Sequence, residues 1–327
     1  MRMSTAAALA ALLAAPTGYH IVNQVRIGGE GGWDYLTVDE AARRLYVSHA
    51  THVVVVDLDA DKVVGDIPDT PGVHGIALAP GLNKGFISNG RGNNVMAFDL
   101  ATLKATGTVA TGENPDSIRY DATSNRVFAF NGRSRNATVI DAKTNAVAAT
   151  IPLPGKPEFA VADGKGHLYV NIEDTAEIAE IDAAKAAMTK KYALTGCDGP
   201  SGLAMDTRNR RLFSVCGNKV MAISDPDAGK VVATAPIGAG ADGAAFDPAT
   251  GYAFSSNGDG TLTILQQSSG QWGVLENVVT ERGARTMALD EKTHKVYLPT
   301  AQPGPPPAAG GRAPFLPDSF KVIVVGR

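Results

Sequence analysis

The sequence predicts an all-β fold, a seven-bladed β-propeller with four antiparallel strands in each blade. Three observations predict it. A similar short motif recurs seven times along the chain, with successive starts 40 to 43 residues apart. Short segments rich in β-branched and aromatic residues follow each copy. The 327 residues include 36 Gly and 19 Pro, which is typical of a fold with many tight turns. Repeats of this length are typical of propellers and other closed or stacked arrays.

The first 18 residues have the composition of an export signal. One basic residue, Arg2, precedes the apolar run from residue 6 to residue 15. That run is too short to cross a bilayer, which needs about 20 apolar residues, but it suits the apolar region of a signal peptide. A frayed N-terminal helix is the alternative. We therefore expect residues 1–18 to be a signal peptide and residues 19–327 to form a single domain in the periplasm or outside the cell, with no membrane span in the mature chain.

The next segment, His20–Ile27, reads as a strand that precedes the first repeat. Each repeat then begins with an inner strand, and the seven inner strands read DYLTVD, HGIALA, DSIRYD, EFAVAD, SGLAMD, DGAAFD and RTMALD. A second, a third and a fourth strand follow in each repeat, but the seventh ends one strand short at FKVIVV. We expect the N-terminal strand to complete the last blade, because this closes the ring and removes an open sheet edge.

The repeats resemble a known type. Stretches such as LYVSHATHVVVVDLDADKVVGDI resemble the YVTN-type repeat, and residues 19–327 resemble the YncE-like family of bacterial seven-bladed propellers. The resemblance implies the propeller fold. It implies no catalytic signature, because surface, periplasmic and nucleic-acid-binding roles have been proposed for different members of the family.

The first position of every inner strand is polar, charged or ionisable. In a propeller these positions surround the central channel on one face, called the top face here. The residues are Asp34, His74, Asp116, Glu158, Ser201, Asp242 and Arg285. Two carboxylates about 8 Å apart repel each other by roughly 2 kcal/mol at an effective dielectric constant of 20. We therefore expect arginine partners, a bound cation or cationic ligand, or a carboxylate with a raised pKa.

The loops between the second and third strands reach the same face and carry a second set of polar residues. The candidates for ligand contact in these loops are Asn89, Arg91, Asn131, Arg133, Asn171, Glu173 and Asn257. Together with the inner-strand positions, they predict a pocket for a small polar ligand at the mouth of the channel. A solvated polar channel neutralised by its own arginines is the alternative.

A metal site is a further hypothesis for this face. The best constellation joins His49 and His74 with Asp34 and Asp116. Two imidazoles and a carboxylate suit zinc, copper or iron, whereas carboxylates alone suit calcium. A divalent ion, Ca, Zn or Cu, is therefore the candidate cofactor.

Three function classes follow from this pattern. The first is an exported binding module for a small polar molecule or a metal ion. The second is a metal-dependent hydrolase or lyase, by analogy with lactonase and streptogramin-lyase propellers, with His74, Glu158 and Asp242 as candidate catalytic residues. The third is a protein–protein interaction scaffold that uses the blade faces. Nucleic acid is not an expected partner, because the net charge is −3.

Two further features are expected near the top face. Cys197 and Cys216 either form a disulfide in an oxidising compartment or remain free thiols. The segment from Ala301 to Asp318 is rich in Pro and Gly and interrupts the seventh repeat. It is either a flap over the channel mouth, with Phe315 and Leu316 as apolar contacts, or a surface loop.

Overall fold

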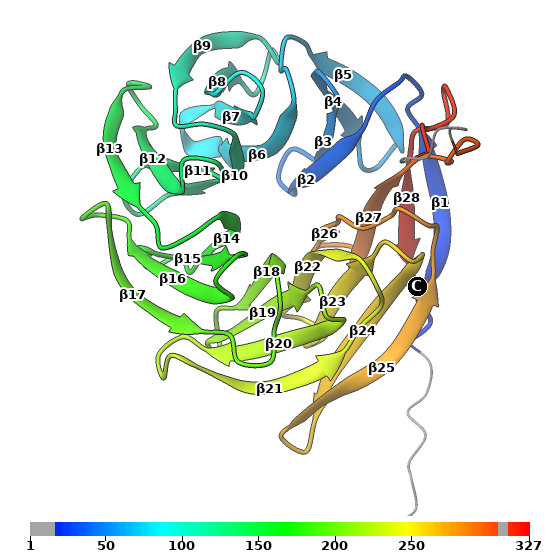
Figure 1. The fold of residues 1–327 in the computed structure, drawn as a ribbon. Coiled ribbons are helices and arrows are strands. Elements are labelled where there is room, and N and C mark those ends of the chain that lie inside the picture. Colours follow the sequence, from blue (N-terminus) through cyan, green and yellow to red (C-terminus); the bar gives the residue numbers. More distant parts are fainter. Residues whose placement is uncertain (1–16, 307–312) are drawn as a thin grey trace, which may run out of the picture.

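Seven four-stranded sheets surround a central channel in the computed structural model, which describes residues 17–306 and 313–327 (Figure 1). Every sheet is antiparallel, and the strands of each sheet follow one another from the channel to the outer rim. One short 3₁₀ helix, η1 (Pro80–Leu82), is the only helix in the described part of the chain. The predicted seven-bladed propeller with four strands in each blade is confirmed.

The first six blades each use four consecutive strands. The first contains β2 (Trp33–Asp39), β3 (Arg44–His49), β4 (His52–Asp57) and β5 (Lys62–Ile67). The second contains β6 (Val73–Ala79), β7 (Lys84–Asn89), β8 (Asn94–Asp99) and β9 (Ala105–Ala110). The third contains β10 (Pro115–Asp121), β11 (Arg126–Asn131), β12 (Asn136–Asp141) and β13 (Val147–Pro152).

The remaining blades continue in the same order. The fourth contains β14 (Pro157–Ala162), β15 (His167–Ile172), β16 (Glu177–Asp182) and β17 (Ala187–Ala193). The fifth contains β18 (Pro200–Asp206), β19 (Arg211–Cys216), β20 (Val220–Asp225) and β21 (Lys230–Pro236). The sixth contains β22 (Ala241–Asp247), β23 (Tyr252–Asn257), β24 (Thr261–Ser268) and β25 (Gln271–Val279). The seventh contains β26 (Ala288–Asp290), β27 (Lys295–Thr300), β28 (Lys321–Gly326) and the N-terminal strand β1 (His20–Arg26).

The N-terminal strand closes the ring as predicted. Strand β1 pairs with β28 in antiparallel fashion, with Val25 opposite Val322, and so supplies the outer strand of the seventh blade. The side chain of Val25 is buried in the apolar cluster between the seventh and first blades. Because β1 covers an edge of β28 that would otherwise be open, closure also removes a site for unwanted strand pairing.

Burial changes systematically from the channel to the rim. The second and third strands, such as β3 and β4, are buried on both faces, because each sheet is packed between two neighbouring blades. Their β-branched and aromatic residues suit that environment. The fourth strands, such as β5, are largely exposed. The apolar core is therefore a set of seven clusters, most of them lying between adjacent blades.

The inner strands share an irregular opening. In the first blade the pairing of β2 with β3 shifts register between Trp33 and Leu36, and the first six blades all shift at the equivalent place. A register break of this kind leaves residues outside the regular in-and-out alternation of a strand and re-aims their side chains. The residues at the break include the polar positions singled out from the sequence.

Hydroxyl groups fix the backbone around these breaks. Ser88 Oγ accepts a hydrogen bond from the backbone N–H of Gly75 and donates one to the carbonyl oxygen of Asp116 in the next blade, at 2.8 and 2.5 Å. Where the ring closes, Thr286 Oγ1 donates a hydrogen bond to the carbonyl oxygen of Asp34 at 2.6 Å, which links the seventh blade to the first. The mouth of the channel is thus held by bonds within and between blades.

The expected signal peptide falls almost entirely on residues 1–16, which lie outside the described residues. No helix among residues 17–306 and 313–327 has the length and apolar character needed to cross a bilayer.

A variant without residues 1–26 should be less stable than one without residues 1–16. It loses six backbone pairings with β28 and the burial of Val25, so we expect its free energy of unfolding to fall by roughly 3–5 kcal/mol. Urea denaturation measures the difference, and light scattering should detect self-association through the uncovered edge. Equal midpoints for the two variants would show that β1 does not close the ring.

Candidate functional site

Three residues from successive blades meet at the mouth of the channel. The Nδ1 atom of His74 lies 2.5 Å from Asp34 Oδ2 and 3.8 Å from Asp116 Oδ1. The three side chains are 27%, 19% and 12% exposed, so they are shielded but reachable from solvent. Among the described residues, this is the one group of three His, Cys, Asp or Glu side chains whose ligand atoms all lie within 4.8 Å of one another.

The charges of this trio are coupled. Burial by itself would lower the pKa of His74, but the hydrogen bond to Asp34 and the charge of Asp116 outweigh it and raise the pKa to about 9. Burial raises the pKa of Asp116 to about 6, although the charge of His74 acts in the opposite direction. At neutral pH, an imidazolium therefore lies between two carboxylates and neutralises part of their repulsion.

The geometry sets a condition on metal binding. The 2.5 Å between His74 Nδ1 and Asp34 Oδ2 is a hydrogen-bond distance, whereas two ligand atoms of a tetrahedral zinc ion, each about 2.0 Å from the metal, are roughly 3.3 Å apart. Imidazole with carboxylates is a donor set that suits zinc or copper better than calcium. An ion held by all three residues thus requires His74 to release its proton and the pair to separate by about 1 Å.

Two other acids at the mouth have a cationic partner that sequence reasoning missed. Lys156 Nζ lies 2.5 Å from Glu158 Oε1 and also donates a hydrogen bond to Glu173. Burial opposes the charge of Lys156, but the two carboxylates outweigh it and raise its pKa. Burial and the charge of Asp116 raise the pKa of Glu158 to about 8, although the hydrogen bond and the charge of Lys156 act to lower it. The signal in the sequence was a basic residue two positions before the inner-strand acid.

Another ion pair at the mouth joins the sixth and seventh blades. Arg285 Nε donates to Asp242 Oδ2 at 2.7 Å, and both side chains are 30% exposed. Ser201 Oγ donates to the backbone carbonyl of Ala241 at 3.1 Å. The expected arginine partner is therefore present for Asp242. Of the four acids at the first inner-strand positions, each has at least one basic side chain within 4 Å.

Arg91 and Arg133 behave differently from Arg285. Both are exposed, and within the described chain neither guanidinium forms an ion pair or a hydrogen bond. They help to line a pocket of about 360 Å³ at the channel mouth. Its lining consists of Gly32, Trp33, Asp34, Ala50, Gly72, Val73, His74, Arg91, Asn114, Arg133 and Arg285.

The loop asparagines lie inside the blades. The side chains of Asn89, Asn131, Asn171 and Asn257 are at most 1% exposed. Asn131, for example, donates to Asn136 Oδ1 and to Thr138 Oγ1, so its amide organises the turn between β11 and β12. The structure does not bring these four amides to the pocket. Those of Asn89, Asn131 and Asn257 donate to side chains of their own blades, and that of Asn171 donates to the backbone carbonyls of Ser201 and Gly202 in the next blade.

His49 also lies apart from the trio. Its imidazole is fully buried and stacks on Phe320 with ring centroids 4.1 Å apart. Neither ring nitrogen has a hydrogen-bond partner within the described residues, and burial lowers the pKa of His49 to about 4. The side chain therefore packs as a neutral ring in the apolar core, which is why it does not join His74 as a metal ligand here.

Aromatic side chains of two inner strands meet across the ring. Tyr35 and Phe159 come from the first and fourth blades, and their ring centroids are 5.0 Å apart. The guanidinium of Arg119 lies over the Phe159 ring at 4.2 Å. Tyr35 and Phe159 directly follow the polar positions Asp34 and Glu158 in the chain, and we attribute the inward direction of both neighbours to the register breaks. Sequence reasoning missed them because it assigned only one residue per strand to the channel.

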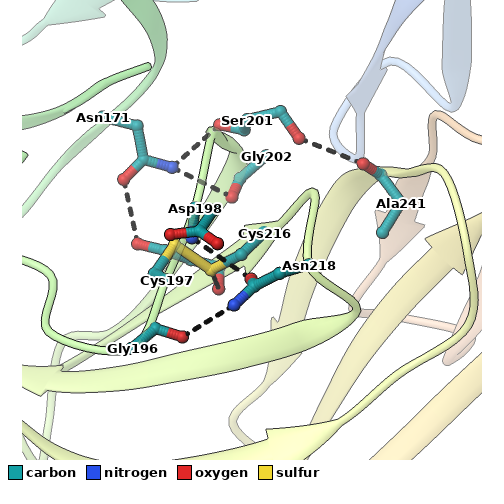
Figure 2. Close-up of a disulfide and its surroundings, with 10 residues drawn as sticks. Asn171, Gly196, Cys197, Asp198, Ser201, Gly202, Cys216, Asn218 and Ala241 are labelled. Atoms are coloured by element: carbon teal, nitrogen blue, oxygen red, sulfur yellow. Dashed lines mark hydrogen bonds between the residues drawn. A yellow bond between two sulfur atoms is a disulfide. The ribbon is translucent and has the colours of Figure 1, made fainter. Parts of the chain in front are cut away.

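The two cysteines form a disulfide in the fifth blade. Cys197, in the loop before β18, is joined to Cys216 at the end of β19 (Figure 2). Asn218 supports the same loop, because its amide donates to the carbonyl of Gly196 and accepts from the backbone N–H of Asp198. The bond thus holds the segment that leads into the inner-strand position at Ser201. Of the two alternatives for the cysteines, the structure has the paired one.

The Pro- and Gly-rich loop is anchored at its base, and residues 307–312 lie outside the described part. Pro303 and Phe315 form an isolated β-bridge, and Phe315 packs on Trp33 with ring centroids 4.7 Å apart. Leu316 is 41% exposed. Figure 1 draws this segment in red beside β1 and the outer part of the last blade, to one side of the central channel.

Comparisons with known proteins show the fold and nothing finer. Hydrazine synthase from Kuenenia stuttgartiensis matches with a TM-score of 0.72 and 16% identity, over 82% of this chain and 92% of that one. The protein U3-55K matches with a TM-score of 0.77 and 8% identity, over 93% and 98%. No protein-family model matches the sequence, and no curated protein gives a significant match.

The His74→Asn variant tests the electrostatics of the trio. The pKa of His74 is raised in the folded state, so its stabilising contribution is complete below its ordinary pKa of about 6.5 and is lost as the pH rises through about 9. The wild type should therefore have the higher free energy of unfolding. Its difference from the variant should be largest near pH 6 and should shrink toward pH 9.5. Urea denaturation across this range measures it, with the exposed His20→Asn as the control. A gap that does not change with pH would contradict the assignment.

Replacing both cysteines by alanine should lower the free energy of unfolding by about 2–4 kcal/mol, because the unfolded chain loses a cross-link between residues 19 apart in sequence. Thermal and urea unfolding without reductant measure the change. Thiol titration of the unfolded, non-reduced wild type should find no free thiol. Two reactive thiols would contradict the bond.

Proposed function

We propose that this protein binds a small polar ligand in the pocket at the top of the channel. The observation that carries the proposal is the pocket itself, a space of about 360 Å³ lined by Asp34, His74 and three arginines on a closed ring of blades. A pocket of this size accommodates one small molecule. Charged groups on several independent blades give a ligand several directions of contact at once.

Two features support a preformed site. The acids at the mouth are paired with basic residues of the protein, so their neutralisation does not depend on a ligand. Tyr35 and Phe159 link the first and fourth blades through the contact of their rings. Little reorganisation is then needed on binding, which favours affinity.

The site of action belongs to the proposal. We infer that the protein is exported to the periplasm or beyond, since its first residues have the composition of a signal peptide and its two cysteines are paired. The repeat pattern supports membership of the YncE-like group of propellers.

A metal centre is the second candidate, and the trio of Asp34, His74 and Asp116 favours it. In a metal-dependent hydrolase or lyase, these residues would hold the ion, which would activate water or polarise a substrate oxygen. Glu158 and Asp242 are then poor candidates for a general base, since each is already paired with a cation.

Equilibrium dialysis tests the ligand proposal. The folded protein is dialysed against a mixture of sugars, amino acids and organic acids, and retained compounds are identified by mass spectrometry. A retained compound at 100 times its dissociation constant should stabilise the wild type by about 2.7 kcal/mol. His20→Asn should respond alike and His74→Asn should not. Retention of no compound, or an equal response in His74→Asn, would refute the proposal.

Metal analysis separates the second candidate. Protein purified without chelator should contain a near-stoichiometric divalent ion, and EDTA should lower its melting temperature, whereas Asp34→Asn should contain none. A metal-free wild type that also fails to bind added zinc, copper or calcium would exclude this candidate and leave the ligand proposal standing.

A further inference from the structure

The lining of the mouth pocket is positively charged, although the whole chain carries a net charge of −3. Three guanidinium groups line it, those of Arg91, Arg133 and Arg285. Among the described residues, Asp34 is the only carboxylate in the lining, and it is already hydrogen-bonded to His74. The local excess of positive charge thus comes from the residues around the pocket, because the protein as a whole has a negative net charge.

Most of the guanidinium donors on these arginines have no acceptor among the residues that the structure describes. Within the described residues, the guanidinium groups of Arg91 and Arg133 form neither ion pairs nor hydrogen bonds, and that of Arg285 uses only its Nε atom, on Asp242. A guanidinium carries five N–H donors in a planar fork, which matches the oxygens of a carboxylate or phosphate. The terminal nitrogens of Arg285 and both other forks remain available at the pocket.

The two free arginines occupy the same place in neighbouring blades. Each follows an Asn-Gly pair at the end of a second strand, after Asn89 in one blade and Asn131 in the next. At the corresponding position the fourth blade has Glu173, which is held by Lys156. The positive side of the mouth is therefore confined to the blades that border the pocket.

Close packing helps to place Arg91 over the pocket. A Cβ atom at Gly72 would lie 2.6 Å from Arg91 Cγ, so the glycine lets the stem of this side chain lie against the backbone. Gly72 has a φ of +65°, a conformation that favours glycine. The same residue also lines the pocket.

We propose that the ligand carries an oxyanion, a carboxylate or phosphate group, which Arg91 and Arg133 bind together with the free edge of Arg285. This inference rests on the proposed function and narrows it to anionic small molecules. The other parts of the ligand then contact the remaining lining, including Asn114 and the uncharged backbone of Gly32.

Calorimetric titration with four probes tests the inference. Inorganic phosphate and glucose 6-phosphate represent phosphate, gluconate represents a carboxylate, and glucose is the uncharged control. At least one anion should bind with an affinity that weakens as sodium chloride rises, and glucose should not bind. The phosphate and gluconate arms then identify which oxyanion the site prefers.

The variants are Arg91→Gln, Arg133→Gln and the double variant. Each single change should weaken anion binding about 10-fold, and the double change about 100-fold or more, because each removes a charge-assisted contact. Both positions are exposed, so circular dichroism and melting temperature should not change. Arg135→Gln is the matched control, since Arg135 is 62% exposed, pairs with Asp174 and does not line the pocket.

Failure of this inference differs from failure of the proposed function. If an uncharged or cationic compound is retained in dialysis and its binding is lost in His74→Asn but unchanged in the double arginine variant, the oxyanion site is refuted and the pocket stands. Anion binding that is unaffected by both arginine changes refutes the inference as well. If no probe and no compound from the mixture binds, both are refuted.

Discussion

The register break at the start of the inner strands is the constraint on which the rest of this molecule depends. A regular strand turns alternate side chains to opposite faces, so a single residue per strand would reach the axis at this level. The breaks direct two neighbours there, as the contacts of Asp34 with His74 and of Tyr35 with Phe159 demonstrate. In the first and fourth blades, one of the two neighbours lies at the polar mouth and the next is an aromatic residue, Tyr35 or Phe159.

Crowding charges around one axis requires neutralisation, and the ring achieves it locally. His74 is shared by two acids, Lys156 by two more, and Arg285 is paired with Asp242. Each cation is contributed by a residue close to the mouth, and none comes from the rim. Arg91 and Arg133 remain outside this balance, which gives the pocket its positive side.

The architecture could be predicted from the sequence because it follows from a regular repeat. A closed seven-bladed ring explains the repeat spacing, the strand content of each repeat and the missing last strand. The ring of inner-strand positions could be predicted for the same reason. The pairings could not, since they depend on which way each side chain turns after the register break. Lys156 was overlooked because it lies outside the repeated position.

The loop residues show a second limit of prediction from the sequence. Asn89 and Asn131 looked equivalent to Arg91 and Arg133 in sequence, because all four are polar and lie in the same loops. The asparagines are buried and donate to side-chain oxygens within their blades, whereas the arginines are exposed and line the pocket. Polarity alone does not separate these two roles, and neither does spacing. His49 was likewise indistinguishable from His74 until its packing against Phe320 was known.

The contact between Tyr35 and Phe159 joins two blades that are not neighbours in the ring. Tyr35 belongs to the first blade and Phe159 to the fourth, so the two rings meet across the axis. A substitution at either ring therefore alters the surroundings of a side chain three blades away.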